Sequence, residues 1–475
     1  MKNLFTATLT LLLSMTLLAT CAIAQTANGG NANTVGETTA AQLAAALNAM
    51  HEGSARASGE TVTLTRNVGM QRNLTVPAGV TLDLTGDGGI WTQRDGVTLT
   101  VNGTVNAPST RIGFDNGSGA RTMTINGNGT INLMSKGNLL NVWSGDGVAR
   151  KLTLDGVTLI GIADNDSPLV DVNNGGELVL VSGAIMGNTR TSDDWASGGG
   201  VNLWHGTFTM SGGEISSNSA VGTGGGSGGG VEVGDGSVFT MSGGAITGNI
   251  TAREGGGVHV WRGMFTMEGG EISGNSVIAE GYPRGGGVNV GEASVFTMSG
   301  GAITGNTTSG HSGGVHIGDG ATFTMSGGAI FGNSARSGGG GVGLIGSFFT
   351  MKDGTIRGNT ASSSGGGVWV QANSTFTMEG GIISGNTGGS NGGGVAVHGG
   401  GTFIMVGGSI YGASAQSGDA NTAPTYAALM DTGTARWGTG GTYTIGGVAQ
   451  TGGNSILPST GARGTNDTLI AVPAR

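Results

Sequence analysis

The chain has little of what anchors or cross-links many proteins. Its 475 residues include one cysteine, Cys21, and only 7 prolines, and 10% of the residues are charged. If Cys21 is removed with an export signal, the mature chain has no cysteine and can form no disulfide. Against 20 Lys and Arg residues stand 29 Asp and Glu residues, which gives a net charge of −9. This acidic balance argues against nucleic acid as a partner, because phosphate binding needs clustered basic residues.

The first 24 residues are typical of an export signal. Lys2 precedes the apolar stretch Leu9–Ala19, and Ala22–Ala24 fits signal-peptidase cleavage before Gln25. The residues that end at Cys21 also resemble a bacterial lipoprotein processing box, so lipidation of Cys21 is an open alternative to soluble export. No later apolar run is long enough to span a membrane. We therefore expect an exported protein, either secreted or at the cell surface, with no membrane span in the mature chain.

What the chain has in excess is glycine, at 103 residues, and a repeated phrase. Phe-Thr-Met or a close variant recurs at intervals of 26, 27 or 31 residues. A period in this range is typical of stacked repeats that contact only their neighbours. The phrases begin at Phe208, Phe239, Phe265, Phe296, Phe323, Phe349, Phe376 and Phe403.

Each repeat contains three short pieces that favour β-strands. In residues 228–254 they are Val231–Val233, Val238–Met241 and Ala245–Thr247, separated by Gly, Asp, Ser and Asn. Such separators suit turns, and alternation within each piece sends the apolar side chains to one side. Three strands per turn at a fixed period predict an all-β chain, a parallel β-helix of about 12–13 coils. Phe, Met and Ile then form inward columns. An Asn recurs at one corner, where amide side chains can hydrogen-bond along the stack.

The ends differ from the repeats and suggest the domain boundaries. After the signal peptide (1–24), residues 25–57 are expected to form a linker and a capping helix at Thr39–Met50. Residues 58–430 are expected to form the β-helix, and 431–475 to close its last coil.

The chain resembles right-handed parallel β-helix proteins, and more narrowly the repeats of chlamydial polymorphic outer-membrane proteins. The resemblance rests on phrases such as Asn333-Ser334-Ala335 and Asn359-Thr360-Ala361, each followed by Gly residues and Val. It covers roughly residues 178–412 and implies adhesion at a bacterial surface. The family's Phe and Gly-Gly-Ala-Ile positions differ here, and those relatives carry a C-terminal membrane barrel for which this chain has no room.

Outward positions of the first strand give a candidate ligand-binding surface. Trp143, Trp204 and Trp261 recur on alternate coils, hence about 10 Å apart, which approximates the length of a disaccharide. They either stack on sugar rings or cover turn edges and neighbouring loops. Neighbouring outward positions on the same strands hold further candidates: Glu232, His259, His316 and Trp369. His259 and His316 lie two coils apart, too far for a zinc chelate, so we expect them to be solvated surface residues.

An acidic loop edge offers a metal or catalytic alternative. Asp164 and Asp166 precede one first strand, and Asp193 and Asp194 precede the next, so the two pairs are expected to share an edge on adjacent coils. Their carboxylates could bind Ca²⁺, which prefers six to eight oxygen ligands. Asp171 and Arg190 lie nearby in sequence as candidate catalytic residues, with Arg190 as the base of a lyase. Polar turn residues without a ligand would give the same pattern.

Three functions therefore remain open. The first is an exported, adhesin-like binding protein that recognises a polysaccharide or a host or cell-surface protein and needs no cofactor. The second is a polysaccharide lyase, calcium-dependent, or a glycoside hydrolase. The third is a purely structural surface protein. Fold alone does not separate them.

Overall fold

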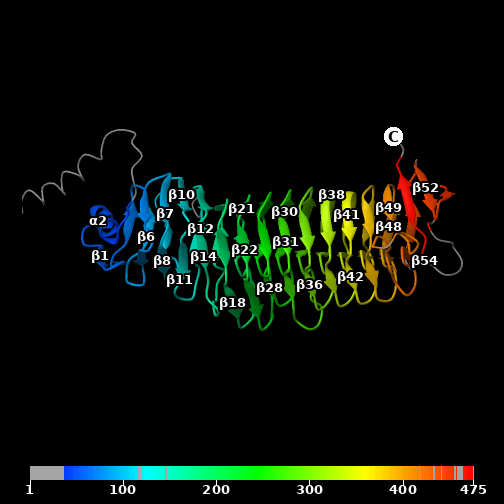
Figure 1. Ribbon diagram of the computed structural model, residues 1–475, viewed down its shortest axis with the longest axis horizontal. Helices are drawn as coiled ribbons and strands as arrows, with labels where there is room; N and C mark the ends of the chain where they lie inside the picture. Colours follow the sequence, from blue (N-terminus) through cyan, green and yellow to red (C-terminus); the bar gives the residue numbers. More distant parts are fainter. Residues whose placement is uncertain are drawn as a thin grey trace, which may run out of the picture. The chain divides into compact units, whose positions relative to one another are not determined.

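The computed structural model describes residues 37–473 except 116, 118, 145–146, 417, 432–433, 440, 454–455 and 457–463. The expected export signal and Cys21 lie outside the described residues. Glu37–Arg475 forms one compact unit, a right-handed parallel β-helix of about 12 turns (Figure 1). The all-β fold predicted from the repeat is confirmed.

One face of the coil, here called the first sheet, is a 15-stranded sheet. Its strands pair in parallel from coil to coil, and the last, β54, pairs antiparallel with β50. The strands are β3 (Val68–Met70), β6 (Ile90–Thr92), β9 (Ile112–Phe114), β12 (Leu140–Trp143), β15 (Val170–Asn173), β20 (Val201–Trp204), β25 (Val231–Val233), β29 (Val258–Val260), β33 (Val288–Val290), β37 (Val315–Ile317), β40 (Val342–Leu344), β43 (Val368–Val370), β47 (Val395–Val397), β50 (Leu429–Asp431) and β54 (Gly464–Thr465).

The other two faces of the coil belong to one 30-stranded sheet, because two long strands, β38 and β41, continue from one face onto the next. The second face comprises β4 (Leu74–Val76), β7 (Val97–Val101), β10 (Arg121–Asn126), β13 (Arg150–Asp155), β16 (Glu177–Leu180), β21 (Thr207–Met210), β26 (Val238–Met241), β30 (Met264–Met267), β34 (Val295–Met298), β38 (Thr322–Phe331), β41 (Phe348–Arg357), β44 (Thr375–Met378), β48 (Thr402–Met405) and β51 (Thr434–Trp437). The third face comprises β2 (Thr61–Leu64), β5 (Thr81–Asp83), β8 (Thr104–Ala107), β11 (Thr130–Leu133), β14 (Thr158–Ile160), β17 (Ala184–Met186), β22 (Glu214–Ser216), β27 (Ala245–Thr247), β31 (Glu271–Ser273), β35 (Ala302–Thr304), β45 (Ile382–Ser384) and β49 (Gly408–Ile410), with the second halves of β38 and β41.

The predicted inward columns are stacked in the structure. Each Phe of the repeated phrase pairs in register with the next, and consecutive rings stack with centroids 4.6–5.0 Å apart. The Met two residues later keeps the same register, for example Met241 beside Met267. The Phe, Met and Ile side chains of these columns are almost fully buried. The stack is close because parallel strands repeat at about 4.8 Å, which is also a favourable distance for offset aromatic rings.

A ladder of buried asparagines holds one corner. Asn306 Nδ2 donates to the Ile272 carbonyl (2.9 Å) and to Asn333 Oδ1 (2.9 Å), and Asn306 Oδ1 accepts from Asn275 Nδ2 (2.9 Å). The same side-chain bonds recur from Asn218 as far as Asn421. At the other end Asn165 Nδ2 donates to Asn188 Oδ1, and the Asn188 backbone amide donates to Asn218 Oδ1. The preceding glycine has the left-handed φ that this corner requires, as at Gly305 (61°). The predicted hydrogen-bonded corner is confirmed.

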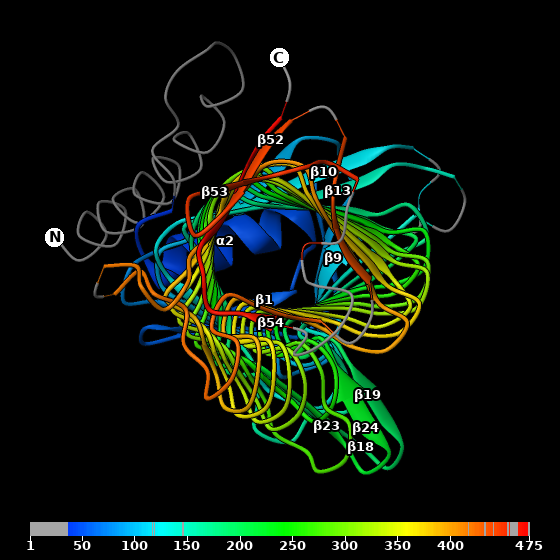
Figure 2. The ribbon, with the colours of Figure 1, turned by 90° about the vertical axis from the view of Figure 1, so that its right-hand side faces the viewer.

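The sequence did not reveal a fourth ladder, which directly follows the Asn corner. Its eight short strands are β18 (Thr189–Ser192), β23 (Ser219–Gly222), β28 (Ile250–Thr251), β32 (Ser276–Val277), β36 (Thr307–Thr308), β39 (Ser334–Ala335), β42 (Thr360–Ala361) and β46 (Thr387–Gly388). A small pair, β19 (Trp195–Ser197) and β24 (Gly225–Ser227), extends it. Seen along the stack, these loops project from one side of the ring of coils (Figure 2).

Both ends of the stack are covered. Helix α2 (Ala40–Met50) begins after Thr39, whose hydroxyl accepts from the Gln42 amide (3.2 Å), and it packs against β1 (Ala55–Ser58) and β2 to β4. Leu43 and Leu47 are fully buried on its inner face, which confirms the predicted cap. At the other end β52 (Thr442–Ile445), β53 (Val448–Gln450) and β55 (Leu469–Val472) pair antiparallel, and β55 also pairs with β49.

Candidate functional site

Three cavities lie along the outer face of the first sheet. The aromatic pocket, of about 370 Å³, is lined by Trp91, Thr110, Ile112, Gly113, Phe114, Asp115, Asn141, Trp143, Ser144, Val148 and Arg150. The amide pocket, of about 550 Å³, is lined by Asn141, Trp143, Asp171, Asn173, Asn174, Asn202 and Trp204. The histidine pocket, of about 280 Å³, is lined by Glu254, His259, Trp261, Arg284, Asn289, Gly291, Glu292, His316, Gly318 and Asp319. The first two share Asn141 and Trp143, so they form one continuous surface.

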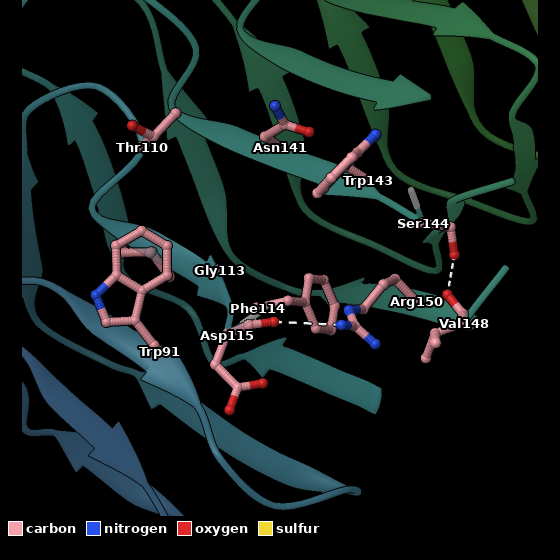
Figure 3. Close-up of a pocket in the computed structure, with 11 residues that line it drawn as sticks. Trp91, Thr110, Gly113, Phe114, Asp115, Asn141, Trp143, Ser144, Val148 and Arg150 are labelled. Carbon is pink, nitrogen blue, oxygen red and sulfur yellow. Dashed lines mark hydrogen bonds between the residues drawn. The ribbon is translucent and has the colours of Figure 1, made fainter. Parts of the chain in front are cut away.

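Two tryptophans face each other across the aromatic pocket. Trp91 extends outward from β6 because its neighbours Ile90 and Thr92 are buried inward, and Trp143 ends β12 two coils further on. Figure 3 shows Trp91 and Trp143 on opposite sides of the cavity, with Phe114 and Arg150 below Trp143 in this view. The intervening coil leaves the space open because it has Gly113 there; a Cβ at Gly113 would lie 3.6 Å from the Trp91 ring.

A buried arginine shapes the rim of this pocket. The Arg150 guanidinium donates to the carbonyls of Gly117 (2.8 Å), Gly119 (2.8 Å) and Asp115 (3.3 Å), and the residue is 7% exposed. The Asp115 carboxylate in turn lies 3.6 Å from Arg121 Nε. The guanidinium of Arg150 thus links the carbonyls of Asp115, Gly117 and Gly119 at this rim.

The amide pocket is organised by one carboxylate. Asp171 in β15 accepts hydrogen bonds from Asn173 Nδ2 (2.8 Å) and from Asn202 Nδ2 (2.8 Å). Trp143 and Trp204, which flank it, are 47% and 44% exposed. Exposed indoles of this kind on both sides of a polar floor are an unusual feature, because large apolar side chains are normally buried.

The indoles of Trp204 and Trp261 do not keep the expected spacing. Their ring centroids lie 5.7 Å apart at an interplanar angle of 24°, although the two residues belong to alternate coils. The coil between them has Gly234 at this position, and a Cβ there would lie 2.8 Å from Trp204 Cε3. The Trp204 ring therefore leans into the vacant position and meets Trp261. Arg262 lies over the Trp261 ring at 4.6 Å and pairs with Glu292 (2.8 Å).

The expectation that His259 and His316 are solvated is wrong. His259 is 5% exposed and His316 is fully buried, because the loops of the fourth ladder cover this part of the sheet. His259 Nδ1 contacts both carboxylate oxygens of Glu232 (2.8 and 3.0 Å), and its Nε2 lies 3.4 Å from Glu254. Glu232, expected to face outward, is itself only 6% exposed.

The two histidines have opposite electrostatic surroundings. Burial alone disfavours a charged His259, but Glu232 and Glu254 outweigh it and raise the pKa of His259 above its usual value. Burial, with the positive charge of Arg284 nearby, holds the pKa of His316 well below its usual value. His316 Nδ1 lies 3.1 Å from Ser312 Oγ. The surroundings therefore favour the charged form of His259 and disfavour the charged form of His316, each relative to a free imidazole.

Trp369 also departs from its expected outward exposure. It is 6% exposed, stacks on His311 with centroids 5.0 Å apart, and meets the edge of His398 at 6.0 Å. The residue is thus part of a packed cluster and does not extend the row of half-exposed tryptophans. Trp91, which sequence reasoning missed, is partly exposed and lies in register with Asn141, in the column beside that of Trp143. Its outward position between Ile90 and Thr92 was readable from strand alternation, but the weaker early repeats concealed the register.

Two of the four carboxylates of the acidic loop edge form hydrogen bonds or ion pairs with neighbouring side chains. Asp164 pairs with Lys136 (2.8 Å) and accepts from Thr191 Oγ1 (2.8 Å), and these bonds lower the pKa of Asp164. Asp166 accepts from Ser167 (2.8 Å). Asp193 and Asp194 are exposed. Within the described part of the chain, no group of three or more His, Cys, Asp or Glu residues is arranged to hold a metal ion. The calcium site stays a prediction.

Arg190 is placed away from the three cavities. It lies in β18, half-buried, and its guanidinium donates to the Ser197 carbonyl. Burial lowers the pKa of Arg190, and Asp171 opposes that shift, so the two residues are electrostatically coupled. Arg190 lines none of the three pockets, whereas Asp171 lines the amide pocket.

Comparison with protein-family models, with curated proteins and with solved structures found no match to this chain. Among the residues described, no helix is long and apolar enough to cross a membrane. The fold and the cavities together define a parallel β-helix protein with a tryptophan-lined surface on one sheet. Function must therefore be inferred from that surface.

Proposed function

We propose that the outer face of the first sheet binds a polysaccharide, and that the protein is an exported binding protein of a cell surface or of the extracellular medium. The proposal rests chiefly on Trp91 and Trp143, which stand on opposite sides of a cavity of about 370 Å³. Binding cavities for small ligands commonly have this size, and sugar rings present flat C–H faces that pack on indoles.

The arrangement along the sheet also supports a chain-like ligand. The aromatic pocket continues into the amide pocket through Trp143, and Trp204 closes the far side of the latter. Amide and carboxylate groups lie between the rings, where they can bond sugar hydroxyls. A linear glycan lying along the coil axis would meet an indole and then polar groups in alternation.

Export is supported by the sequence of residues 1–24 alone. A lipid anchor at Cys21 is the alternative to release as a soluble protein. Adhesion to a host or cell-surface protein is the second proposal, carried by the repeats' resemblance to those of surface proteins. Catalysis by Asp171 and Arg190 is less favoured, because Arg190 lines none of the three cavities.

Affinity electrophoresis of the full chain against plant, microbial and host polysaccharides tests the proposal. We expect at least one polysaccharide to retard the protein. Trp91→Ala with Trp143→Ala should weaken binding roughly hundredfold or more, since two buried indoles at about 1.5–3 kcal/mol each contribute at least about 3 kcal/mol together.

The matched control is Trp195→Ala. Trp195 is 39% exposed but belongs to β19 in the projecting loops, away from the pockets. Its removal should leave retardation unchanged. Absence of retardation by every polysaccharide, or equal loss in the control, would overturn the proposal. New reducing or unsaturated ends in the bound glycan would instead show an enzyme.

A further inference from the structure

The amide pocket offers a ligand hydrogen-bond acceptors and one negative charge. Of its seven lining residues only Asp171 is charged, and four are asparagines. The amino group of Asn173 faces the Asp171 carboxylate, which can only accept, so Asn173 Oδ1 must point elsewhere. Asn173 Oδ1 and Asn141 Oδ1 are both buried and have no hydrogen-bond partner among the described residues.

Unpartnered acceptors of this kind call for a donor. A buried carbonyl oxygen without a partner costs roughly 1–3 kcal/mol, which a ligand supplying N–H or O–H groups can recover. Two of the acceptor positions of Asp171 are used by Asn173 and Asn202, which also fix its orientation. The remaining positions stay available to a ligand in the pocket.

The flanking indoles favour a positive charge on that ligand. Trp143 and Trp204 are both about half-exposed and line the same pocket as Asp171. The face of an indole attracts an ammonium group, and it does so more strongly than the other aromatic side chains. The net charge of −9 acts in the same direction over the whole chain.

Neighbouring charges do not cancel that of Asp171. Arg190 from β18 is the cation coupled to it, but Arg190 is coupled to Glu232 and Asp166 as well. Three coils beyond Asp171, His259 lies between Glu232 and Glu254. The three carboxylates of Asp171, Glu232 and Asp166 therefore outnumber the one guanidinium to which they are coupled.

We propose that the amide pocket binds the protonated amino group of an amino sugar, with the ammonium on Asp171 and the ring between Trp143 and Trp204. This inference rests on the proposed polysaccharide binding and specifies its ligand as a glycan with free amino groups. The neighbouring aromatic pocket lies on the same surface and takes the adjoining sugar of the chain.

Isothermal titration of the full chain with three β-1,4-linked hexamers tests the inference: glucosamine, N-acetylglucosamine and glucose. We expect the glucosamine hexamer to bind roughly fivefold or more tightly than the glucose hexamer, the size expected for an ammonium group that donates a hydrogen bond to the Asp171 carboxylate. Asp171→Asn should bring that ratio close to one. Trp143→Ala should weaken all hexamers that bind.

Glu268→Gln is the matched control. Glu268 is exposed in the turn after β30, so this variant removes the same charge from another side of the coil. It should keep the preference for glucosamine, which separates a local effect from the charge of the whole protein. The circular dichroism spectrum and the unfolding midpoint of Asp171→Asn verify that it is folded.

The outcomes separate the two proposals. Equal affinity for the glucosamine and glucose hexamers in the unmodified protein, or a preference that survives Asp171→Asn, would overturn the amino-sugar inference while leaving polysaccharide binding intact. Preference for the N-acetylated hexamer would overturn it in the same way. Failure of every hexamer and every polysaccharide to bind would overturn the proposed function itself.

Discussion

The outer face of the first sheet is more exposed to solvent in the coils before residue 208 than in the coils after it. In the earlier coils outward positions of the first sheet such as Asn141 and Asp171 are partly exposed, and two cavities open there. In the later coils the corresponding positions from Glu232 onward are buried. All strands of the fourth ladder except β18 belong to the later coils, and bridges from Ser227 through Glu254 and Arg284 to His311 run beside the sheet.

The same division separates regular from irregular packing. The later coils repeat one Phe stack and one Asn ladder, whereas the earlier coils bury aliphatic side chains such as Leu99, Ile125 and Leu154 without a common repeat. Regular repeats gain stability from stacking identical side chains on adjacent coils, but they allow little variation on the surface. The irregular coils are free to present Trp91, Phe114 and Arg150 together. We infer that the later coils mainly stabilise and the earlier ones mainly bind.

The largest effect should follow from removing a ring of the Phe stack. Phe296 is fully buried, with centroids 4.8 Å from Phe265 and 4.6 Å from Phe323. Phe296→Ala should lower the free energy of unfolding by about 3–5 kcal/mol, because it leaves a cavity and ends two stacked contacts. Chemical denaturation measures it. The exposed Phe348 is the control, since Phe348→Ala should change stability by less than about 0.5 kcal/mol. Equal losses in both variants would contradict the role of the stack.

Breaking the Asn ladder should cost slightly less. Asn306→Ala leaves the Ile272 carbonyl and the Asn275 amide unpartnered in the interior, a loss of about 3 kcal/mol. The comparison is Asn132→Ala in an earlier coil, where the half-buried side chain donates a hydrogen bond to Asn106 Oδ1 (2.9 Å). Its loss should cost about 1 kcal/mol. The two denaturation midpoints should differ accordingly. A larger loss of unfolding free energy in Asn132→Ala than in Asn306→Ala would contradict the expected contribution of the Asn ladder.

The two glycines between tryptophans should respond differently to a methyl group. Gly234→Ala places a Cβ 2.8 Å from Trp204 Cε3 and 2.7 Å from the Leu203 carbonyl, so we expect a loss of about 1–3 kcal/mol and separation of the Trp204–Trp261 stack. Gly113→Ala meets the Trp91 ring only at 3.6 Å, an ordinary contact, and should be nearly neutral. Tryptophan fluorescence and unfolding midpoints report both. An unchanged emission spectrum in Gly234→Ala would argue that the stack is not formed.

The smallest effect concerns pH and is confined to the later coils. His316 has a lowered pKa, so the folded state binds fewer protons there than the unfolded state, and stability should fall as pH drops below about 6.5. His311, which contributes to that shift, has a lowered pKa too and acts in the same direction. His259 has a raised pKa, so its contribution is complete below about 6.5 and is lost as pH rises through the folded value.

Stability should therefore be greatest near pH 6.5, with slopes of at most about 1.4 kcal/mol per pH unit for each histidine. Thermal unfolding between about pH 4 and pH 9 measures the profile. His316→Gln should flatten the acid side, and His259→Gln the alkaline side. A profile that neither variant alters would mean that both imidazoles titrate as in the unfolded chain.

The sequence by itself determined the scaffold. The 26- or 27-residue period, the alternation within each strand and the Gly-Asn corners are local rules repeated many times, so every repeat independently indicated the same coil. The Phe, Met, Ile and Asn columns followed because equivalent positions of a stacked repeat must lie one strand apart. The capping helix at Thr39–Met50 could be predicted because its apolar residues follow the 3.6-residue period of an α-helix.

Only the tertiary structure decided which outward residues reach a ligand. Alternation predicts that the side chains of Glu232, His259, His316 and Trp369 point out of the coil. It does not predict that the loops of the fourth ladder bury them. It places Trp204 and Trp261 two coils apart, but the vacant position at Gly234 brings their rings together at 5.7 Å. Burial and ring contacts depend on what neighbouring coils place over a position, and that information is spread over segments roughly 30 to 60 residues apart in a stack of this period.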